Sequence, residues 1–148
     1  MRLVVLHPRW ADLTLLASHM TQRKSPYKST GGPARLASAL NYSTRGLLAA
    51  FRHEAAFRQE LLATAILIPL AFWIGRNTGE VLVLIAPLFF VLVVEMLNSA
   101  VEAISDAVTL EHHVLIGRAK DLGSAAVMLS IILAVIVWGA VIASHVLR

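Results

Sequence analysis

Two glutamates and an asparagine are spaced along one stretch of this sequence so that a helix would place them on one face. On a helix that turns by about 100° per residue, Glu95, Asn98 and Glu102 fall on one side. Ser99 and Asp106 belong to the same stripe, which is about 100° wide. A carboxylate at the centre of a membrane span costs roughly 2.5–3.5 kcal/mol on insertion scales, so such residues usually face a polar cleft and serve a function. The stripe therefore predicts a functional polar site.

Paired carboxylates near a membrane surface suit metal-assisted phosphoryl transfer. That reaction needs Mg²⁺ held by oxygen ligands, a cation near the phosphates and a group that orients the attacking hydroxyl. Glu54 and Glu102 could hold the metal, and Lys120 offers the cation. Glu95 lies about two turns deeper along the helix, where a lipid headgroup hydroxyl would be, and its position suits a general base.

Other interpretations of the stripe remain open at this point. Asn98 could form hydrogen bonds between helices, and Asp106 could be a solvated surface residue. The sequence contains no G-x-x-x-x-G-K-[ST] loop and no protein-kinase motif set. The residues alone therefore indicate a functional, metal-binding acidic stripe in a membrane protein, and they do not name the reaction.

The composition is that of a membrane protein. Of 148 residues, 57% are apolar and 15% charged, whereas soluble domains carry about 45–50% and about 25%. The length indicates one domain at most, and the absence of Cys excludes disulfides and cysteine-based metal sites. Nine of the thirteen Lys and Arg residues occur at or before Arg58. Such a basic segment beside apolar spans indicates a membrane surface rather than a nucleic-acid partner.

Three apolar runs predict an all-α membrane protein with three transmembrane helices. The runs extend from about Leu61 to Ile74 (back to Glu54 if the helix is to span), from Val81 into the acidic stripe, and from about Leu122 to Val146. A polar turn at 76–80 and a polar connection at 109–121 separate them. Residues 34–53 predict an amphipathic helix in the membrane interface. We expect a variable or disordered extension at 1–33 and a membrane domain at 34–148.

The distribution of basic residues predicts the topology. The positive-inside rule gives a cytoplasmic N-terminus, a cytoplasmic 109–121 connection and a periplasmic C-terminus. Both polar segments then share the side that contains ATP. Small residues at the start of the third span would allow close approach of helices and favour an oligomer.

Three ordered segments resemble those of one family, the prokaryotic diacylglycerol kinases. Residues 54–60 resemble its EAAFRQE segment, and residues 94–103 resemble its VE-x-LNSA-x-EA signature. Residues 117–127, GRAKDLGSAAV, resemble its third motif. The resemblance extends from about residue 35 to the end of the chain, and residues 1–30 have no recognised counterpart.

The resemblance implies an inner-membrane homotrimer of three-span subunits, with an N-terminal surface helix and active sites shared between neighbouring subunits. It implies Mg²⁺-dependent transfer of the ATP γ-phosphate to diacylglycerol, giving phosphatidate for lipid recycling. Glu95 then corresponds to the proton acceptor, and Glu54 and Glu102 to metal ligands beside ATP. The other implied nucleotide contacts are Arg35, Tyr42, Glu111, His113, Lys120 and Asp121. The implied lipid-side positions, besides Glu95, are Phe57, Arg58, Gln59, Glu60, Trp73, Asn98, Ser124 and Trp138.

Two alternatives remain beside this expectation. Undecaprenol kinase is a sister enzyme on the same scaffold, and residues 54–60 and 123–126 look more like the diacylglycerol branch. A non-enzymatic three-span protein, such as a small ion carrier or assembly subunit, would use the acidic stripe to line a pore. The polar residues gather on the cytoplasmic half of the second span, and the other spans lack charged partners at mid-depth, which disfavours a pore.

Overall fold

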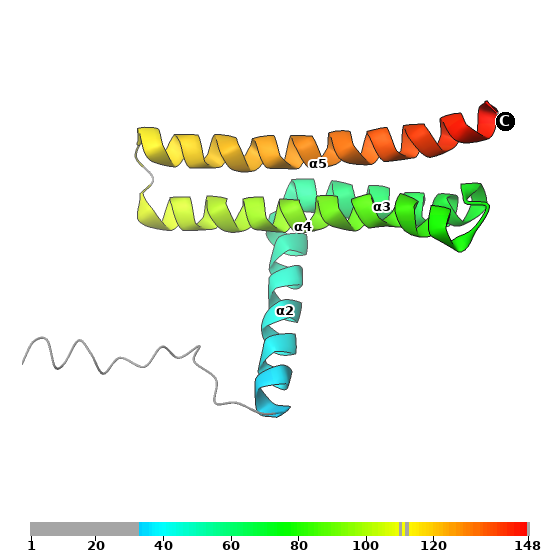
Figure 1. Ribbon diagram of the computed structural model, residues 1–148. Coiled ribbons are helices and arrows are strands. Elements are labelled where there is room, and N and C mark those ends of the chain that lie inside the picture. The colour runs from blue at the N-terminus through cyan, green and yellow to red at the C-terminus, as the bar shows by residue number, and fades with distance from the viewer. Residues whose placement is uncertain (1–32, 110, 112, 148) are drawn as a thin grey trace, which may run out of the picture. The chain divides into compact units, whose positions relative to one another are not determined.

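The computed structural model describes residues 33–109, 111 and 113–147 (Figure 1). Within these ranges the chain forms helices and no strand, which confirms the all-α prediction. The helices are α2 (Pro33–His53), α3 (Ala55–Ile74), α4 (Thr78–Val108) and α5 (Val114–Val146). Helices α3, α4 and α5 are each long and apolar enough to cross a membrane. The predicted extension at 1–33 lies, except for Pro33, outside the described residues.

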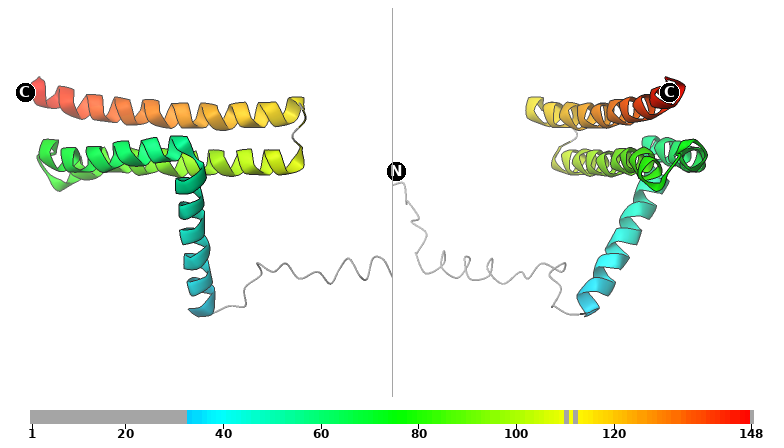
Figure 2. Two further views of the ribbon diagram at one scale, coloured as in Figure 1. Left: turned by 180° about the vertical axis from the view of Figure 1, so that it is seen from behind. Right: turned by 45° about the vertical axis from the view of Figure 1, so that its right-hand side comes forward.

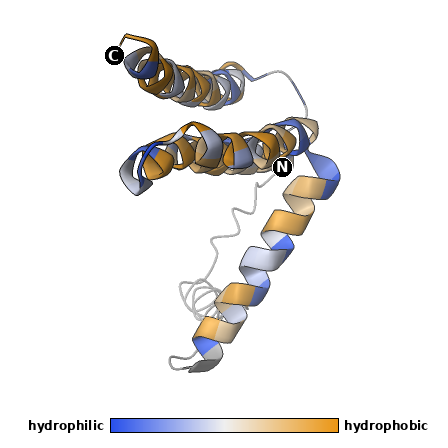
Figure 3. Ribbon diagram, turned by 90° about the vertical axis from the view of Figure 1, so that its right-hand side faces the viewer, coloured by the Kyte–Doolittle hydropathy of each residue, from blue (hydrophilic) through white to orange (hydrophobic). Residues whose placement is uncertain are grey.

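Helix α2 crosses the boundary between two units of the chain, Met1–Ser43 and Thr44–Arg148. Polar and apolar residues alternate along it, as the hydropathy colouring of Figure 3 shows. Its large apolar side chains are mostly exposed: Leu36, Leu40, Leu47, Leu48 and Phe51. An uncovered apolar face fits the predicted helix in the membrane interface.

Helices α3, α4 and α5 lie side by side and alternate in direction (Figures 1 and 2). The α3–α4 turn is tight because Gly75 has no side chain. A Cβ there would stand 2.6 Å from Val81 Cγ2 and 3.0 Å from the carbonyl oxygen of Ala71. Asn77 then caps α4, since its Oδ1 accepts a hydrogen bond from the Glu80 backbone N–H at 3.0 Å. These two residues let the chain reverse within three positions.

Helix α4 is the central helix, since it packs against both α3 and α5. One core cluster contains Ala71, Leu84, Leu88 and Trp138. The Trp138 indole N–H is buried and donates to the Leu84 carbonyl at 3.0 Å, which satisfies the polar atom of a large apolar side chain. Residues Ser130 and Ala134 precede Trp138 at intervals of four and are also buried. Helix α5 therefore packs through a narrow stripe of mostly small residues.

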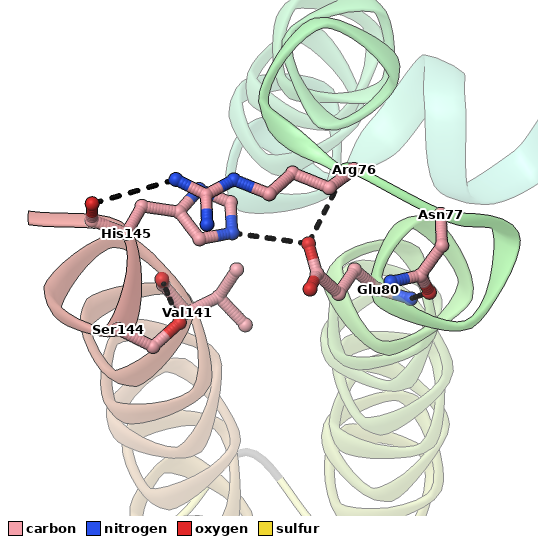
Figure 4. Close-up of polar contacts among 6 residues, drawn as sticks. All are labelled: Arg76, Asn77, Glu80, Val141, Ser144 and His145. Carbon is pink, nitrogen blue, oxygen red and sulfur yellow. Dashed lines mark hydrogen bonds and ion pairs between the residues drawn. The ribbon is translucent and has the colours of Figure 1, made fainter. Parts of the chain in front are cut away.

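A polar cluster links the end of α5 to the α3–α4 turn (Figure 4). The Glu80 carboxylate accepts a hydrogen bond from the Arg76 backbone N–H at 3.0 Å and lies 3.0 Å from His145 Nε2. The Arg76 guanidinium donates to the His145 carbonyl at 3.4 Å. This cluster holds the α5 C-terminal end at one end of the bundle, away from the α4–α5 connection.

One predicted boundary is wrong. Helix α5 begins at Val114, whereas the apolar run predicted a start near Leu122. Hydropathy detects an uninterrupted apolar run, and Arg118, Lys120 and Asp121 interrupt that run within the first turns of α5. Lys120 and Asp121 consequently lie on the first turns of α5 instead of in a loop.

We expect Trp138→Phe to destabilise the bundle. The substitution keeps an aromatic ring but leaves the Leu84 carbonyl without its indole donor, so the free energy of unfolding should fall by at least about 1 kcal/mol. Trp73→Phe is the matched control, because Trp73 is 83% exposed, and it should change stability by less than about 0.5 kcal/mol. Denaturant titration in micelles measures both. Equal destabilisation by the two substitutions would contradict the assigned hydrogen bond.

Candidate functional site

The acidic stripe of α4 faces inward at its centre. Glu95 is 4% exposed, Asn98 and Glu102 are half-buried, and Asp106 is exposed. A carboxylate this deeply buried within an apolar helix has to face a polar surrounding. The predicted stripe is therefore present, and it runs from the interior of the bundle towards the α4–α5 connection.

Glu54 joins this stripe from another element. It is the one residue between α2 and α3, where an extended backbone (φ −103°, ψ 114°) interrupts the helix. Its side chain lines a cavity of about 430 Å³ together with Glu95, Asn98 and Glu102 of α4 and Ser124 of α5. The rest of this carboxylate pocket is apolar: Ala56, Val127, Met128, Ile131 and Ile132. The structure thus brings together the predicted base, both predicted metal ligands and two predicted lipid-side residues.

The polar groups of the stripe are only partly satisfied. Asn98 Nδ2 donates to Glu102 Oε1 at 3.1 Å, which orients that carboxylate. Within the described chain, Asn98 Oδ1 and Ser99 Oγ are buried without a hydrogen-bond partner. Buried polar atoms normally have partners, so the single chain leaves part of the hydrogen-bonding capacity of this stripe unused.

The pocket supplies the oxygen donors that a hard cation such as Mg²⁺ prefers. Among the described residues, however, no three His, Asp or Glu side chains are close enough to form a complete metal site. A cation that uses Glu54 and Glu102 would therefore need further ligands from outside the described chain. These donors suit a metal ion that binds together with a phosphate-bearing substrate better than an ion held by protein ligands alone.

Lys120 lies near the Asp106 end of the stripe, but not in the pocket wall. Its Nζ is 2.6 Å from Asp106 Oδ1, and both side chains are substantially exposed. Asp106 belongs to the predicted stripe, but no sequence signal pairs it with Lys120, which is 14 positions away on another helix. Asp121, Glu111 and His113 are exposed, and none of them lines the carboxylate pocket.

A larger apolar groove adjoins the carboxylate pocket, since Ile131 lines both. The groove has a volume of about 650 Å³, and its polar lining residues are Gln59, Glu60 and Thr64. Glu60 Oε2 is buried and has no partner within the described chain. Trp138 forms part of the groove wall. The two cavities together place an apolar volume beside a group of carboxylates.

The remaining predicted lipid-side residues lie outside both cavities. Phe57 is 3% exposed and packs against Ala50 and Leu92. Arg58 Nη1 donates to the carbonyls of Phe51 and Arg52, at 3.2 and 3.3 Å, and so caps the end of α2. Core packing explains the presence of Phe57, and capping of α2 explains that of Arg58. The lipid contacts of both residues stay predictions.

Three further predicted contacts are not tested by this arrangement. Trp73 is exposed on α3 and lines neither cavity. Arg35 and Tyr42 belong to the first unit of the chain, and the carboxylate pocket belongs to the second. Their roles also stay predictions.

Comparisons with known proteins agree on one family. The family model described as "Prokaryotic diacylglycerol kinase" matches residues 41–142. A diacylglycerol kinase of Pseudomonas aeruginosa is 45% identical over 118 residues, covering 80% of this chain and 96% of that protein. The Escherichia coli diacylglycerol kinase is 45% identical over 117 residues (79% and 96%). The Haemophilus influenzae diacylglycerol kinase is 43% identical over 116 residues (78% and 98%).

Phe57→Ala should act on stability rather than selectively on lipid binding. Removing this buried ring leaves a cavity beside Ala50 and Leu92, and the free energy of unfolding should fall by about 3–5 kcal/mol. Phe51→Ala, at a half-exposed position, should cost less than about 1 kcal/mol. Equilibrium unfolding in micelles compares the two. A raised KM for lipid at unchanged stability would instead favour direct lipid contact by Phe57.

Proposed function

Since this chain belongs to the prokaryotic diacylglycerol kinase family, we propose that it transfers the γ-phosphate of ATP to the free hydroxyl of diacylglycerol, forming phosphatidate. The observation that carries the proposal is the apolar groove that adjoins the carboxylate pocket at Ile131. A lipid substrate needs an apolar volume for its chains beside polar groups for its reacting end. The two cavities supply these side by side.

Glu95 is the proposed general base. It is the most buried carboxylate of the stripe and lines the pocket next to the groove. As the lipid hydroxyl oxygen attacks the γ-phosphorus, Glu95 accepts the hydroxyl proton and the bond to the ADP oxygen breaks. Gln59 and Glu60, in the groove lining, can bind the glycerol or ester oxygens. Asn98 and Ser124 line the carboxylate pocket, and Trp138 lines the groove.

Glu54 and Glu102 would hold Mg²⁺ together with phosphate oxygens of ATP. When bound, the ion would neutralise charge on the transferring phosphate. The incomplete ligand set among the described residues fits this shared coordination, because Mg²⁺ in such sites usually takes one or two carboxylates plus substrate phosphates.

The nucleotide is proposed to lie at the α4–α5 end of the pocket. Lys120 provides a positive charge there, and Asp106 fixes its ammonium group at 2.6 Å. Asp121, Glu111 and His113 are exposed around the same end of α5. Arg35 and Tyr42 of α2 complete the proposed nucleotide contacts.

We place the protein in the bacterial inner membrane, with the N-terminus and the nucleotide side in the cytoplasm and the C-terminus in the periplasm. The bias of Lys and Arg towards the N-terminal part supports this orientation. The family match begins at residue 41, which is compatible with a membrane domain at 34–148 preceded by an extension at 1–33. Lipid recycling is the corresponding physiological role.

A homotrimer with active sites shared between subunits is the proposed assembly. Helix α5 buries only a narrow stripe, and many of its large apolar residues are exposed, among them Leu129, Ile132, Val135 and Ile136. Neighbouring subunits would cover part of this surface and supply a partner for the unpaired Ser99 hydroxyl. One chain alone leaves the pocket open.

Replacing Glu95 tests the proposed activity and its base together. Wild-type protein in mixed micelles should phosphorylate diacylglycerol from ATP, and Glu95→Gln should lower kcat by about 10²–10⁴-fold, because the amide cannot accept the proton. Transfer of radiolabelled γ-phosphate measures the rate, and size-exclusion chromatography in detergent checks that the assembly survives.

A parallel reaction with undecaprenol distinguishes the sister activity. Turnover of undecaprenol alone would assign the chain to the polyprenol kinases. Absence of turnover with either lipid would favour a non-enzymatic membrane protein and contradict the proposal.

Glu102→Gln should raise the Mg²⁺ concentration required for half-maximal rate by about tenfold or more, since one ionised oxygen ligand is lost. Glu80→Gln is the matched control. It lies on the same helix but is bonded to Arg76 and His145 at the other end of the bundle. Its Mg²⁺ dependence should equal that of the wild type, and the same shift in both variants would refute the assigned metal ligand.

A further inference from the structure

Gly123 of α5 lies directly against Asn98 of α4. A Cβ at position 123 would clash with Asn98 Oδ1 and would stand 3.3 Å from Asn98 Cγ and 3.8 Å from Asn98 Cα. Glycine is unfavourable in the interior of a helix compared with alanine. The close approach gives a physical reason for its presence here, because only a residue without a side chain leaves room for the Asn98 amide.

The Asn98 side chain occupies this space in one particular orientation. Its Nδ2 donates to Glu102 Oε1 at 3.1 Å, while its Oδ1 points at the α5 backbone near Gly123. The α5 backbone therefore limits rotation of the amide on one side, and Glu102 restrains it on the other. Ser124, the next residue of α5, lines the carboxylate pocket, so this contact lies at the pocket wall.

A methyl group at position 123 would force one of two changes. Either α4 and α5 separate locally, or the Asn98 amide turns away from α5. Turning the amide breaks its hydrogen bond to Glu102 and releases that carboxylate from its present direction. Gly117, on the same helix, lacks this constraint, because a Cβ there would meet nothing within 4 Å.

We propose that Gly123 is a positioning residue for phosphoryl transfer, which acts through Asn98 to orient the Glu102 carboxylate. The inference rests on the proposed function for the role of Glu102. It assigns to the glycine no contact with substrate or metal. Its effect on the reaction passes entirely through the space that it leaves for the amide.

The test compares Gly123→Ala with Gly117→Ala as the matched control. Gly123→Ala should lower kcat by about 10–100-fold, as expected for a misplaced catalytic group, and should raise the half-saturating Mg²⁺ concentration. The KM for diacylglycerol should change little, because position 123 does not line the apolar groove. Gly117→Ala should retain the wild-type rate and Mg²⁺ dependence.

A double-mutant cycle with Asn98→Ala separates positioning from general damage. Asn98→Ala removes both atoms that a Cβ at 123 approaches most closely, so the double variant should regain the thermal stability that Gly123→Ala loses. In this background Gly123→Ala should have little further effect on kcat or on Mg²⁺ dependence, since the residue through which it acts is absent. Independent, multiplicative effects of the two substitutions would overturn the proposal.

Failure of the proposed function is distinguishable from failure of this inference. Wild-type protein without lipid kinase activity would overturn the function and, with it, the catalytic role of Gly123. Suppose instead that the wild type is active and that Gly123→Ala has the same kcat and the same half-saturating Mg²⁺ concentration as the Gly117→Ala control. That result would overturn only the positioning role.

Discussion

The structure depends on the cost of burying carboxylates inside an apolar helix. Glu95 is almost fully enclosed on α4, and an ionisable group at membrane depth is stable only beside polar partners or a polar cavity. Asn98 of α4 and Ser124 of α5 give the pocket around it polar walls. Glu54 from the α2–α3 break and Glu102 of α4 add further negative charge, which a bound cation would balance. The carboxylate pocket exists because these elements converge at one level of the bundle.

The packing on either side of the pocket follows from the same arrangement. Towards one end, the apolar groove continues from Ile131 to Trp138, whose indole is satisfied by a backbone carbonyl. Towards the other, the stripe emerges at the Asp106–Lys120 ion pair. A lipid and a nucleotide approach a site of this kind from different environments, one from the bilayer and one from water. Helix α4 suits both approaches, because it is apolar beside the groove and polar towards Asp106.

Much of this could be predicted from the sequence, because the signals are local. The spans follow from apolar runs, and the stripe of Glu95, Asn98 and Glu102 follows from helical periodicity. Contacts between helices depend on their rotation and register, which periodicity does not determine. The Asp106–Lys120 pair, the burial of Phe57 and the fit of Gly123 against Asn98 therefore required the structure. The start of α5 was mispredicted because charged residues at 118–121 interrupt the apolar run after the first turn of the helix.

The most direct test of the central claim is a structure of the protein in a lipid bilayer with Mg²⁺, diacylglycerol and a non-hydrolysable ATP analogue. The account predicts the nucleotide phosphates and the ion beside Glu54 and Glu102, and the glycerol hydroxyl hydrogen-bonded to Glu95. A nucleotide bound elsewhere, for example beside the Arg76, Glu80 and His145 cluster at the other end of the bundle, would contradict it.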